Sequence, residues 1–424
     1  MHNNATTYFF ELLQMGVGRR EGLSGTPVKE EWKAMFRMAR EQALVGVFTE
    51  AVCRLPEEMR PPRKPLTRLC SEVVMIEDAN RRLLGKCCDL TEALAADGFD
   101  SCILKGQGMA LLYPRPLLRK SGDIDVWVKS PGQRPQLGES CESLEDTLYN
   151  YARTKGTIRD AVYHHLAIPL SIERNADGKV TMKSSEDHAD EIEIHFRPSF
   201  MFCPRHNRRM QEWFDEQWPL QQKHTVQVKP EFFAPDRKSD ARTFCCPTPS
   251  FNTIYCLTHI YRHLFDEGIG LRQLLDYYYV ASPPALPERE GAAKLTTGGI
   301  DNENKKEIIA NLKRFGLYRF AQAVMYVLHE VFALPESEML VPMNKKTGRF
   351  LLDEILRAGN FGRFDDRVSI QANETPFHKL IRRQRYSLRL LRYFPSEVLL
   401  QPYFKVWHRR WRLRHGWIKS MRED

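Results

Sequence analysis

The fold of this chain is decided by residues 102–128, which read CILKGQGMALLYPRPLLRKSGDIDVWV. The apolar start, Cys102 to Leu104, predicts a short strand that ends in a glycine-containing turn at residues 105–108. An apolar turn or two of helix and a proline-containing loop follow, and residues 123–128 then predict a second strand. The stretch therefore predicts a strand, a turn that opens a short helix, and a strand that begins with two aspartates.

The two aspartates, Asp123 and Asp125, are two residues apart, so both carboxylates leave the same side of the sheet, about 7 Å apart along the strand. The apolar residues Ile124, Val126 and Val128 occupy the opposite side, where we expect a core. Carboxylates this close repel each other unless a cation lies between them. Mg²⁺ is the usual cation, because it takes oxygen ligands and bridges substrate phosphates.

A third carboxylate is expected on a later strand, because two-metal phosphoryl chemistry needs more oxygen ligands than two aspartates supply. Residues 190–196, DEIEIHF, alternate polar and apolar as a strand does. This alternation places Glu191, Glu193 and His195 on one face. We predict Glu193 as the ligand because it lies in the motif Glu-Ile-His-Phe, although Glu191 shares its face.

These motifs resemble the DNA polymerase β-type nucleotidyltransferase superfamily, whose core has a glycine-containing turn that opens a helix, an Asp-hydrophobic-Asp strand and a later carboxylate strand. Where that superfamily usually has Gly-Ser after the first strand, this chain has Lys105-Gly106. An uncharacterised bacterial nucleotidyltransferase-like family is more similar still, over roughly residues 40–290. The segments that carry this resemblance are Leu104-Lys105-Gly106, Leu112-Tyr113-Pro114, Arg119, Asp123-Ile124-Asp125 and Glu193-Ile194-His195-Phe196.

The fold class expected from the resemblance is α+β, with a small mixed β-sheet nucleotidyltransferase core flanked by N- and C-terminal helical regions. We predict an N-terminal helical region at residues 1–98, the α/β core at 99–240, and a C-terminal helical region with a basic tail at 241–424. Apolar residues at helical intervals predict several helices. The predicted helices span residues 8–17, 29–53, 66–97, 131–155, 253–263, 271–280, 306–315 and 318–332, with a short helix within 201–250 and a linker at 281–306.

The resemblance also implies an enzyme that transfers a nucleoside monophosphate from a nucleoside triphosphate (NTP), such as ATP, to a hydroxyl group. Asp123 and Asp125 would bridge two Mg²⁺ ions, and Glu193 would bind the ion on the acceptor side and could take the hydroxyl proton. The acceptor stays open between a small molecule, a sugar and a protein side chain. A second hypothesis is a nucleotide-binding or regulatory protein of the same fold that has lost turnover.

Five further residues are candidates for nucleotide binding. Gly106 lets the backbone approach phosphate at a turn that opens a helix, and Lys105 could add a positive charge on the triphosphate. Arg119 could contact phosphate or be a surface charge. His195 could orient the acceptor or a carboxylate, or be a hydrogen-bonded structural histidine. Arg272 could reach the nucleotide or pair with the aspartate one helical turn later.

The composition is that of a globular protein of two or three cores, with 424 residues, 42% hydrophobic and 28% charged. No apolar run approaches the ~20 residues that span a bilayer, and the N-terminus lacks the features of a signal peptide. The ten cysteines show no metal-binding spacing. They indicate reduced thiols, so we expect a cytoplasmic protein.

The net charge of +9 belongs to the tail, because residues 378–424 carry thirteen Lys or Arg and three Asp or Glu. These charges alternate with aromatic residues that include Trp407, Trp411 and Trp417. Such a mixture could bind nucleic acid or an anionic membrane surface, or form a solvated helical face with buried aromatic anchors. A third hypothesis is therefore an RNA-directed transferase that uses this tail.

Overall fold

The computed structural model describes residues 4–130, 143–175, 177–184, 190–233, 242–281, 302–365 and 387–418. Two compact units share the chain, and each is assembled from separate segments. The first unit contains Met1–Asp78, Ala110–Lys120 and Asn252–Val398, and the second contains Ala79–Met109, Ser121–Phe251 and Leu399–Asp424. The three regions expected from the sequence, 1–98, 99–240 and 241–424, stay a prediction.

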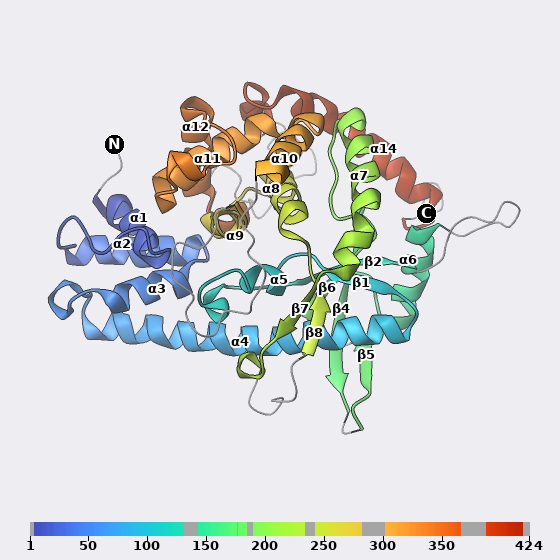
Figure 1. Ribbon diagram of the computed structural model, residues 1–424, viewed down its shortest axis with the longest axis horizontal. Coiled ribbons are helices and arrows are strands. Elements are labelled where there is room, and N and C mark those ends of the chain that lie inside the picture. Colours follow the sequence, from blue (N-terminus) through green and yellow to red (C-terminus); the bar gives the residue numbers. More distant parts are fainter. Residues whose placement is uncertain are drawn as a thin grey trace, which may run out of the picture. The chain divides into compact units, whose positions relative to one another are not determined.

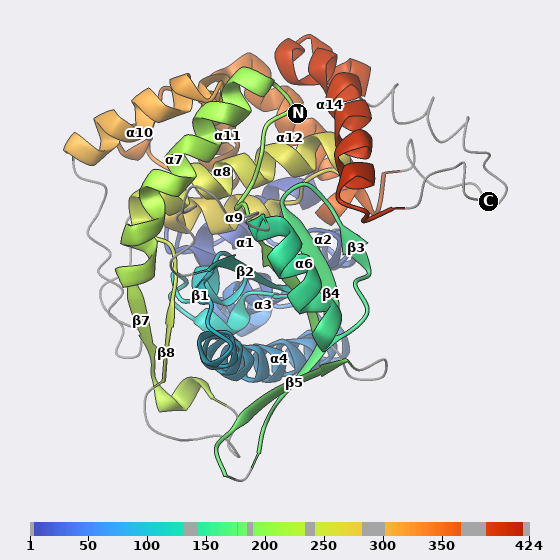
Figure 2. The ribbon, with the colours of Figure 1, turned by 90° about the vertical axis from the view of Figure 1, so that its right-hand side faces the viewer.

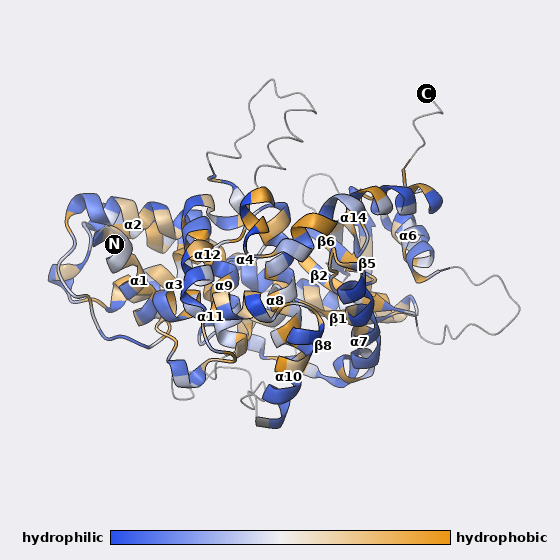
Figure 3. Ribbon diagram, turned by 90° about the horizontal axis from the view of Figure 1, so that it is seen from above, coloured by the Kyte–Doolittle hydropathy of each residue, from blue (hydrophilic) through white to orange (hydrophobic). Residues whose placement is uncertain are grey.

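The first unit is helical, in the segments where the apolar spacing predicts helices. Hydrophobic and hydrophilic residues lie side by side on helices such as α1, α11 and α12, as expected of helices that bury one face (Figure 3). Helices α4, α8 and α14 contribute residues to both units. The helices of this unit are α1 (Asn4–Gly16), α2 (Lys29–Glu41), α3 (Val45–Arg54), α4 (Arg63–Ala96), α8 (Pro249–Asp266), α9 (Leu271–Ala281), α10 (Asn302–Arg314), α11 (Tyr318–Phe332), α12 (Lys345–Ala358) and α14 (Pro395–Arg414).

A bend divides the single helix that the spacing predicts over residues 29–53, so that α2 and α3 form there instead. Ala43 lies at the bend with φ 55°, in the left-handed region that a helix cannot continue through. The neighbouring side chain of Gln42 is buried and bonded at both ends: Nε2 donates to the carbonyl of Ile355 (3.1 Å), and Oε1 accepts from the amide of Leu271 (2.8 Å). These contacts, distant in sequence, override the helical spacing.

The second unit contains a six-stranded sheet in the order β1-β2-β6-β4-β3, with β5 paired to β4. Strands β2 and β6 are parallel and the other pairs are antiparallel, so the mixed sheet is confirmed. The strands β4 and β5 form a hairpin that projects from the sheet (Figure 2). The strands are β1 (Asp100–Ile103), β2 (Ile124–Lys129), β3 (Asp160–Ala161), β4 (His165–Arg174), β5 (Val180–Ser184) and β6 (Asp190–His195).

The other elements of the second unit depart from the expected lengths. The apolar helix after the turn is a single turn, and the region 201–250 holds a long helix and a two-stranded hairpin where a short helix is predicted. The long helix begins with Pro204, a residue suited to the first helical position. These elements are α5 (Gln107–Ala110), α6 (Leu144–Lys155), α7 (Pro204–Lys223), β7 (Thr225–Val228) and β8 (Arg242–Cys245).

The two faces of the sheet differ in chemistry. Residues 79–96 of α4 run across one face (Figure 1), and an ion pair between Lys86 and Asp190 joins this helix to β6. Asp125 and Glu193 are paired across β2 and β6, and strand alternation directs their side chains to the opposite face, away from α4. The α4 side receives the buried apolar side chains Ile124, Val126, Val128, Ile192 and Ile194.

Three sequence predictions lie partly outside the described residues: the helix over 131–155, the linker over 281–306 and the basic tail. The described end of the first of these forms α6. Among the described helices, none has a segment long and apolar enough to cross a membrane. The cysteines that the structure describes are free thiols, and the cytoplasmic location stays a prediction.

Candidate active site

The turn after β1 brings the end of that strand to the start of β2. The backbone amide of Leu104 donates to the carbonyl of Asp125 (2.9 Å). Gly106 follows with φ 65°, and a Cβ at this position would lie 3.3 Å from the carbonyl oxygen of Asp123. Both facts call for glycine. The turn therefore holds the side chain of Lys105 beside the acidic strand.

The central pair of the site is Asp125 and Glu193, which lie directly opposite each other on the parallel strands β2 and β6. His195 Nε2 lies 3.1 Å from Asp125 Oδ1 and 3.2 Å from Glu193 Oε2. Lys105 Nζ lies 2.7 Å from the same Asp125 oxygen and 3.9 Å from Glu193 Oε2. Two carboxylates from separate strands are thus joined by two cationic side chains.

Burial is uneven across the acids. The side chain of Asp125 is 0% exposed and that of Glu193 is 18% exposed. Among the described residues, Asp125 Oδ2 has no hydrogen-bond partner. Leaving a buried carboxylate oxygen unpaired is costly, so a bound cation or ligand at this oxygen would be favourable.

The charges in the cluster are set by competition between burial and neighbouring charges. Burial alone would lower the pKa of His195, but its hydrogen bonds to Asp125 and Glu193 outweigh this and raise the pKa to about 9. Burial alone would raise the pKa of Glu193, but Lys105 and His195 lower it to about 2. Burial also opposes the charge of Lys105, and the surrounding carboxylates nevertheless raise its pKa. At neutral pH the cluster therefore contains an ammonium and an imidazolium beside the carboxylates.

The remaining predicted acids lie at the margin of this cluster. Asp123 precedes β2 and is exposed, and its charge helps to raise the pKa of Lys105. Glu191 shares the face of Glu193, but its side chain is 49% exposed and lies 3.7 Å from Arg159. The structure thus brings Glu193, and not Glu191, beside Asp125.

One residue of the cluster was not expected from the sequence. His165 on β4 lies opposite His195 on β6, and its Nε2 is 3.7 Å from Glu193 Oε1. Burial, His195 and Lys105 hold the pKa of His165 well below its usual value, so this imidazole is neutral. Strand alternation could assign His165 to a face, but only the sheet order shows that this face meets Glu193.

The two candidate arginines belong to the first unit, and each has a partner there. Arg119 Nε and Nη2 donate to Asp276 Oδ1 (2.7 Å) and Oδ2 (2.8 Å), and the Tyr113 hydroxyl also donates to Oδ1 (2.7 Å). Burial would raise the pKa of Asp276, but Arg119 lowers it. Arg119 is therefore a buried ion-pair residue and not a surface charge. Arg272 donates to the carbonyl of Lys120 (2.8 Å), and its charge also helps to lower the pKa of Asp276.

The donor set fits a hard divalent ion. Ligand oxygens of Asp125 and Glu193 lie within 4.8 Å of each other, and the unpaired Asp125 Oδ2 adds a third oxygen. His195, as an imidazolium, has no lone pair for a metal and holds the carboxylates instead. Carboxylate oxygens suit Mg²⁺, whereas the neighbouring imidazoles of His164 and His165 are ligands that zinc prefers. Lys105 and His195 already neutralise part of the negative charge of these carboxylates.

The match to a family model agrees with the nucleotidyltransferase resemblance of the sequence motifs. A family model described as "Uncharacterised nucleotidyltransferase" matches residues 28–284, a span that includes all of the candidate residues. Among solved structures the chain is similar to an antigenic nucleotidyltransferase-like protein from Paracoccidioides brasiliensis, at 15% identity over 53% of this chain and 84% of that chain. The TM-score of that match is 0.27. No curated protein matches the chain.

Proposed function

The chain belongs to the uncharacterised nucleotidyltransferase family, and from this membership we propose that it transfers a nucleoside monophosphate from an NTP to a hydroxyl group, with loss of pyrophosphate. The observation that carries the proposal is the pairing of Asp125 with Glu193 across β2 and β6. Asp123, which lies exposed just before β2, would add a third carboxylate to this pair. A hard cation beside a triphosphate needs such a set of oxygens.

Metal binding would be the task of Asp123, Asp125 and Glu193. A bound Mg²⁺ supplies electrostatic stabilisation of the charge on the α-phosphate and lowers the pKa of the attacking hydroxyl. Glu193 would bind the metal, because Lys105 and His195 lower its pKa and keep the carboxylate ionised, and it could also take the hydroxyl proton. His195 would hold both carboxylates in place through its two hydrogen bonds.

Lys105 would serve as a built-in cation. Lys105 lies in the turn after β1, and its Nζ is 2.7 Å from Asp125 Oδ1 and 3.9 Å from Glu193 Oε2. We propose that this charge takes the place of one of the two Mg²⁺ ions expected from the superfamily resemblance, so that a single divalent ion is needed. Gly106 would let the backbone of the turn approach the phosphates.

A second candidate function, nucleotide binding without turnover, is favoured by the same lysine. The ammonium of Lys105 neutralises the charge of Asp125 through its Oδ1 atom without any metal. A protein that has lost its metal requirement would need such a cation. NTP binding that needs no Mg²⁺ and yields no pyrophosphate would identify this function.

An RNA acceptor, or contact with an anionic membrane surface, is a further proposal for the basic tail. Helix α14 packs aromatic rings inward, with Phe404 stacked on Phe200 at 4.8 Å between centroids. Its residues Arg409, Arg410 and Arg414 are exposed. An exposed row of arginines on a helix supports electrostatic contact with phosphates.

Pyrophosphate release from each of the four NTPs, with Mg²⁺ and with cell extract as the source of acceptor, tests the main proposal. We expect release by the natural chain and at least a hundredfold loss in Asp125→Asn and in Glu193→Gln, on the scale of a lost electrostatic group. Glu191→Gln is the matched control, because Glu191 lies on the same strand and face, and it should stay within about twofold. Turnover that survives Asp125→Asn would refute the assignment.

A further inference from the structure

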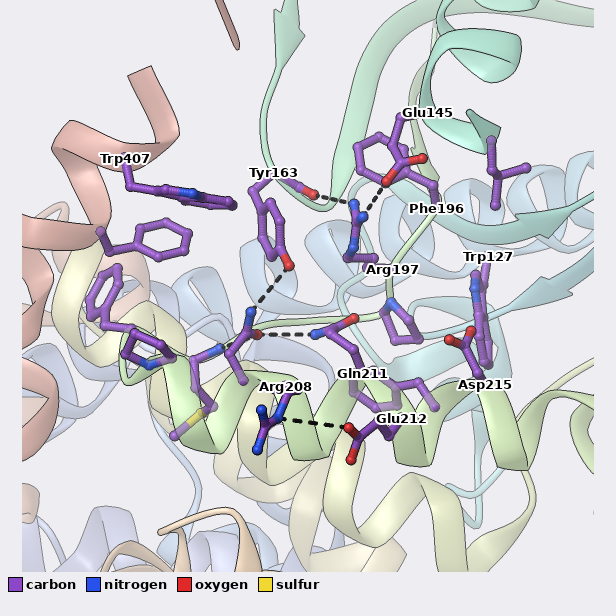
Figure 4. Close-up of a pocket in the computed structure, with 18 of the residues that line it drawn as sticks. Trp127, Glu145, Tyr163, Phe196, Arg197, Arg208, Gln211, Glu212, Asp215 and Trp407 are labelled. Carbon is purple, nitrogen blue, oxygen red and sulfur yellow. Dashed lines mark hydrogen bonds and ion pairs between the residues drawn. The ribbon is translucent and has the colours of Figure 1, made fainter. Parts of the chain in front are cut away.

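A cavity of about 650 Å³ opens in the second unit, between the ends of β2 and β6 and the helices α7 and α14 (Figure 4). It lies on the sheet face that carries the candidate acids. Trp127 follows Asp125 on β2 and Arg197 follows His195 after β6, each by two residues, so each pair shares a face. Two residues of strand advance the chain by about 7 Å. The cavity therefore begins about 7 Å along each strand from the candidate acids.

Hydrogen bonds of His195 connect the cavity wall to the candidate acids. His195 Nε2 contacts Asp125 and Glu193, and its other ring nitrogen, Nδ1, lies 3.3 Å from the carbonyl oxygen of Arg197. The guanidinium of Arg197 lies over the ring of Tyr163, 4.6 Å from its centroid, and lines the cavity. One histidine thus positions both the carboxylates and the cavity wall.

The charges that line the cavity balance one another. An NTP carries several negative charges and needs an excess of cations, which this lining does not offer. Its volume is in the range of pockets for small ligands, and an uncharged molecule suits its balanced walls. The cationic and acidic lining residues form three ion pairs: Lys129 with Asp215 (2.6 Å), Arg197 with Glu145, and Arg208 with Glu212 (3.8 Å).

Aromatic rings stand on two sides of the cavity. Figure 4 shows Tyr163 and Trp407 on one side and Trp127 on the other. Trp407 is 36% exposed, and Tyr403 at the same helix is 60% exposed, so both offer ring surface to a ligand. The ring of Trp127 is fully buried and forms part of the cavity lining.

Two amide side chains on α7 are held in fixed positions. Gln211 Nε2 donates to the carbonyl of Ser199 (2.9 Å) and to Asn207 Oδ1 (3.1 Å), and Asn207 Nδ2 donates to the Tyr163 hydroxyl (3.1 Å). Oriented amides recognise hydroxyl groups, while the electron-rich ring faces attract the weakly positive C–H face of a sugar ring. The combination of ring faces, oriented amides and balanced charge suits a polyhydroxylated ring.

We propose that this cavity binds the acceptor, and that the acceptor is an uncharged sugar or a similar cyclic polyol. The inference rests on the proposed function. A hydroxyl oxygen of the bound sugar forms a new bond to the α-phosphorus of the NTP, and the bond from that phosphorus to the β-phosphate oxygen breaks. Pyrophosphate leaves with the electron pair, and the hydroxyl proton passes to solvent. The product is a nucleoside monophosphate ester of the sugar.

Saturation-transfer-difference NMR with a mixture of glucose, galactose, mannose and N-acetylglucosamine tests the cavity. We expect at least one sugar to bind, with its Kd raised about tenfold or more in Trp407→Ala and in Gln211→Ala. Val406→Ala is the matched control, because Val406 is an exposed neighbour on α14 that does not line the cavity. Absence of sugar signal, signal indifferent to both cavity variants, or displacement of the sugar by adenosine would overturn the inference.

Pyrophosphate release measured in the same samples with Mg²⁺-ATP separates this inference from the proposed function. Sugar binding that depends on Trp407 and Gln211 but yields no pyrophosphate would uphold the cavity as a sugar site and refute the transferase. Pyrophosphate release without sugar binding would uphold the transferase and refute the sugar site.

Discussion

The ammonium of Lys105 lies 2.7 Å from Oδ1 of Asp125, whose side chain is completely buried. Asp125 lies on β2, and Lys105 lies in the glycine-containing turn after β1, which brings the two side chains together. Removing one partner of a buried ion pair leaves an uncompensated charge, which commonly costs about 3–5 kcal/mol. We therefore expect this pair to contribute to stability and, under the proposed function, to set the number of metal ions bound.

Lys105→Met should increase the number of divalent ions that the protein binds. Mn²⁺ titration followed by electron paramagnetic resonance should give about one ion for the natural chain and about two for the variant, because the missing charge must be replaced. The variant should also unfold at a lower temperature in EDTA and recover with Mn²⁺. Lys129→Met is the control, because Lys129 on β2 pairs with Asp215 on α7 and not with the candidate acids, and it should leave the ion count unchanged. Equal ion counts for the natural chain and Lys105→Met would contradict the assignment.

Arg119→Met should destabilise the first unit by about 3–5 kcal/mol, because Asp276 would stay buried without its partner. Thermal unfolding followed by calorimetry measures this loss. Arg37→Met is the control: Arg37 lies 3.7 Å from Glu41 on an exposed helix face, where an ion pair contributes at most about 1 kcal/mol. If both variants unfold at the same temperature as the natural chain, the buried pair has no structural role.

Gly106→Ala should reduce pyrophosphate release as well as stability. The alanine would have to adopt φ 65°, and its Cβ would press on the carbonyl of Asp123. Gly178→Ala is the matched control, because Gly178 has φ 84° and nothing lies within 4 Å of an added Cβ. Both variants should lose about 1 kcal/mol of stability, and only Gly106→Ala should lose activity. Equal activity in the two would show that the turn does not position Asp123.

Acidification should loosen helix α14 through His408. Burial and the charge of Arg412 lower the pKa of His408 to about 4, below its usual value of 6.5. A folded-state pKa below the unfolded one means that the neutral histidine favours folding, so this stability is complete above pH 6.5 and is lost as the pH falls towards 4. The difference in melting temperature between the natural chain and His408→Gln should change over this pH window and stay constant above it. A constant difference throughout would contradict the assignment.

The arginines of α14 should contribute to any RNA binding by charge alone. For a uridine 20-mer, Arg409→Ala with Arg410→Ala should make the slope of log affinity against log salt less steep by about 1.4, or about 0.7 per lost phosphate contact. Arg37→Ala serves as a control for general surface charge. An unchanged slope, or no binding of the 20-mer by the natural chain, would exclude this helix as an RNA site.

Alternation along each strand determined the faces of the site residues from the sequence alone. A two-residue period is a local property, so it places Asp125, and likewise Glu193 with His195, on single faces without knowledge of the fold. The turn required a residue free to adopt positive φ, and Gly106 is that residue. The long helix α4 and most other helices followed from local apolar spacing, whereas the mixed sheet was expected from the family resemblance.

Only the tertiary structure decided which faces meet. Strand order and register depend on burial across long sequence separations, which local spacing does not encode. The register of β2 against β6 makes Glu193 the partner of Asp125, and the neighbouring strand β4 adds His165. In the same way, Arg119 lies in a surface-like loop by sequence, yet it is buried because Asp276, 157 residues later, neutralises its charge.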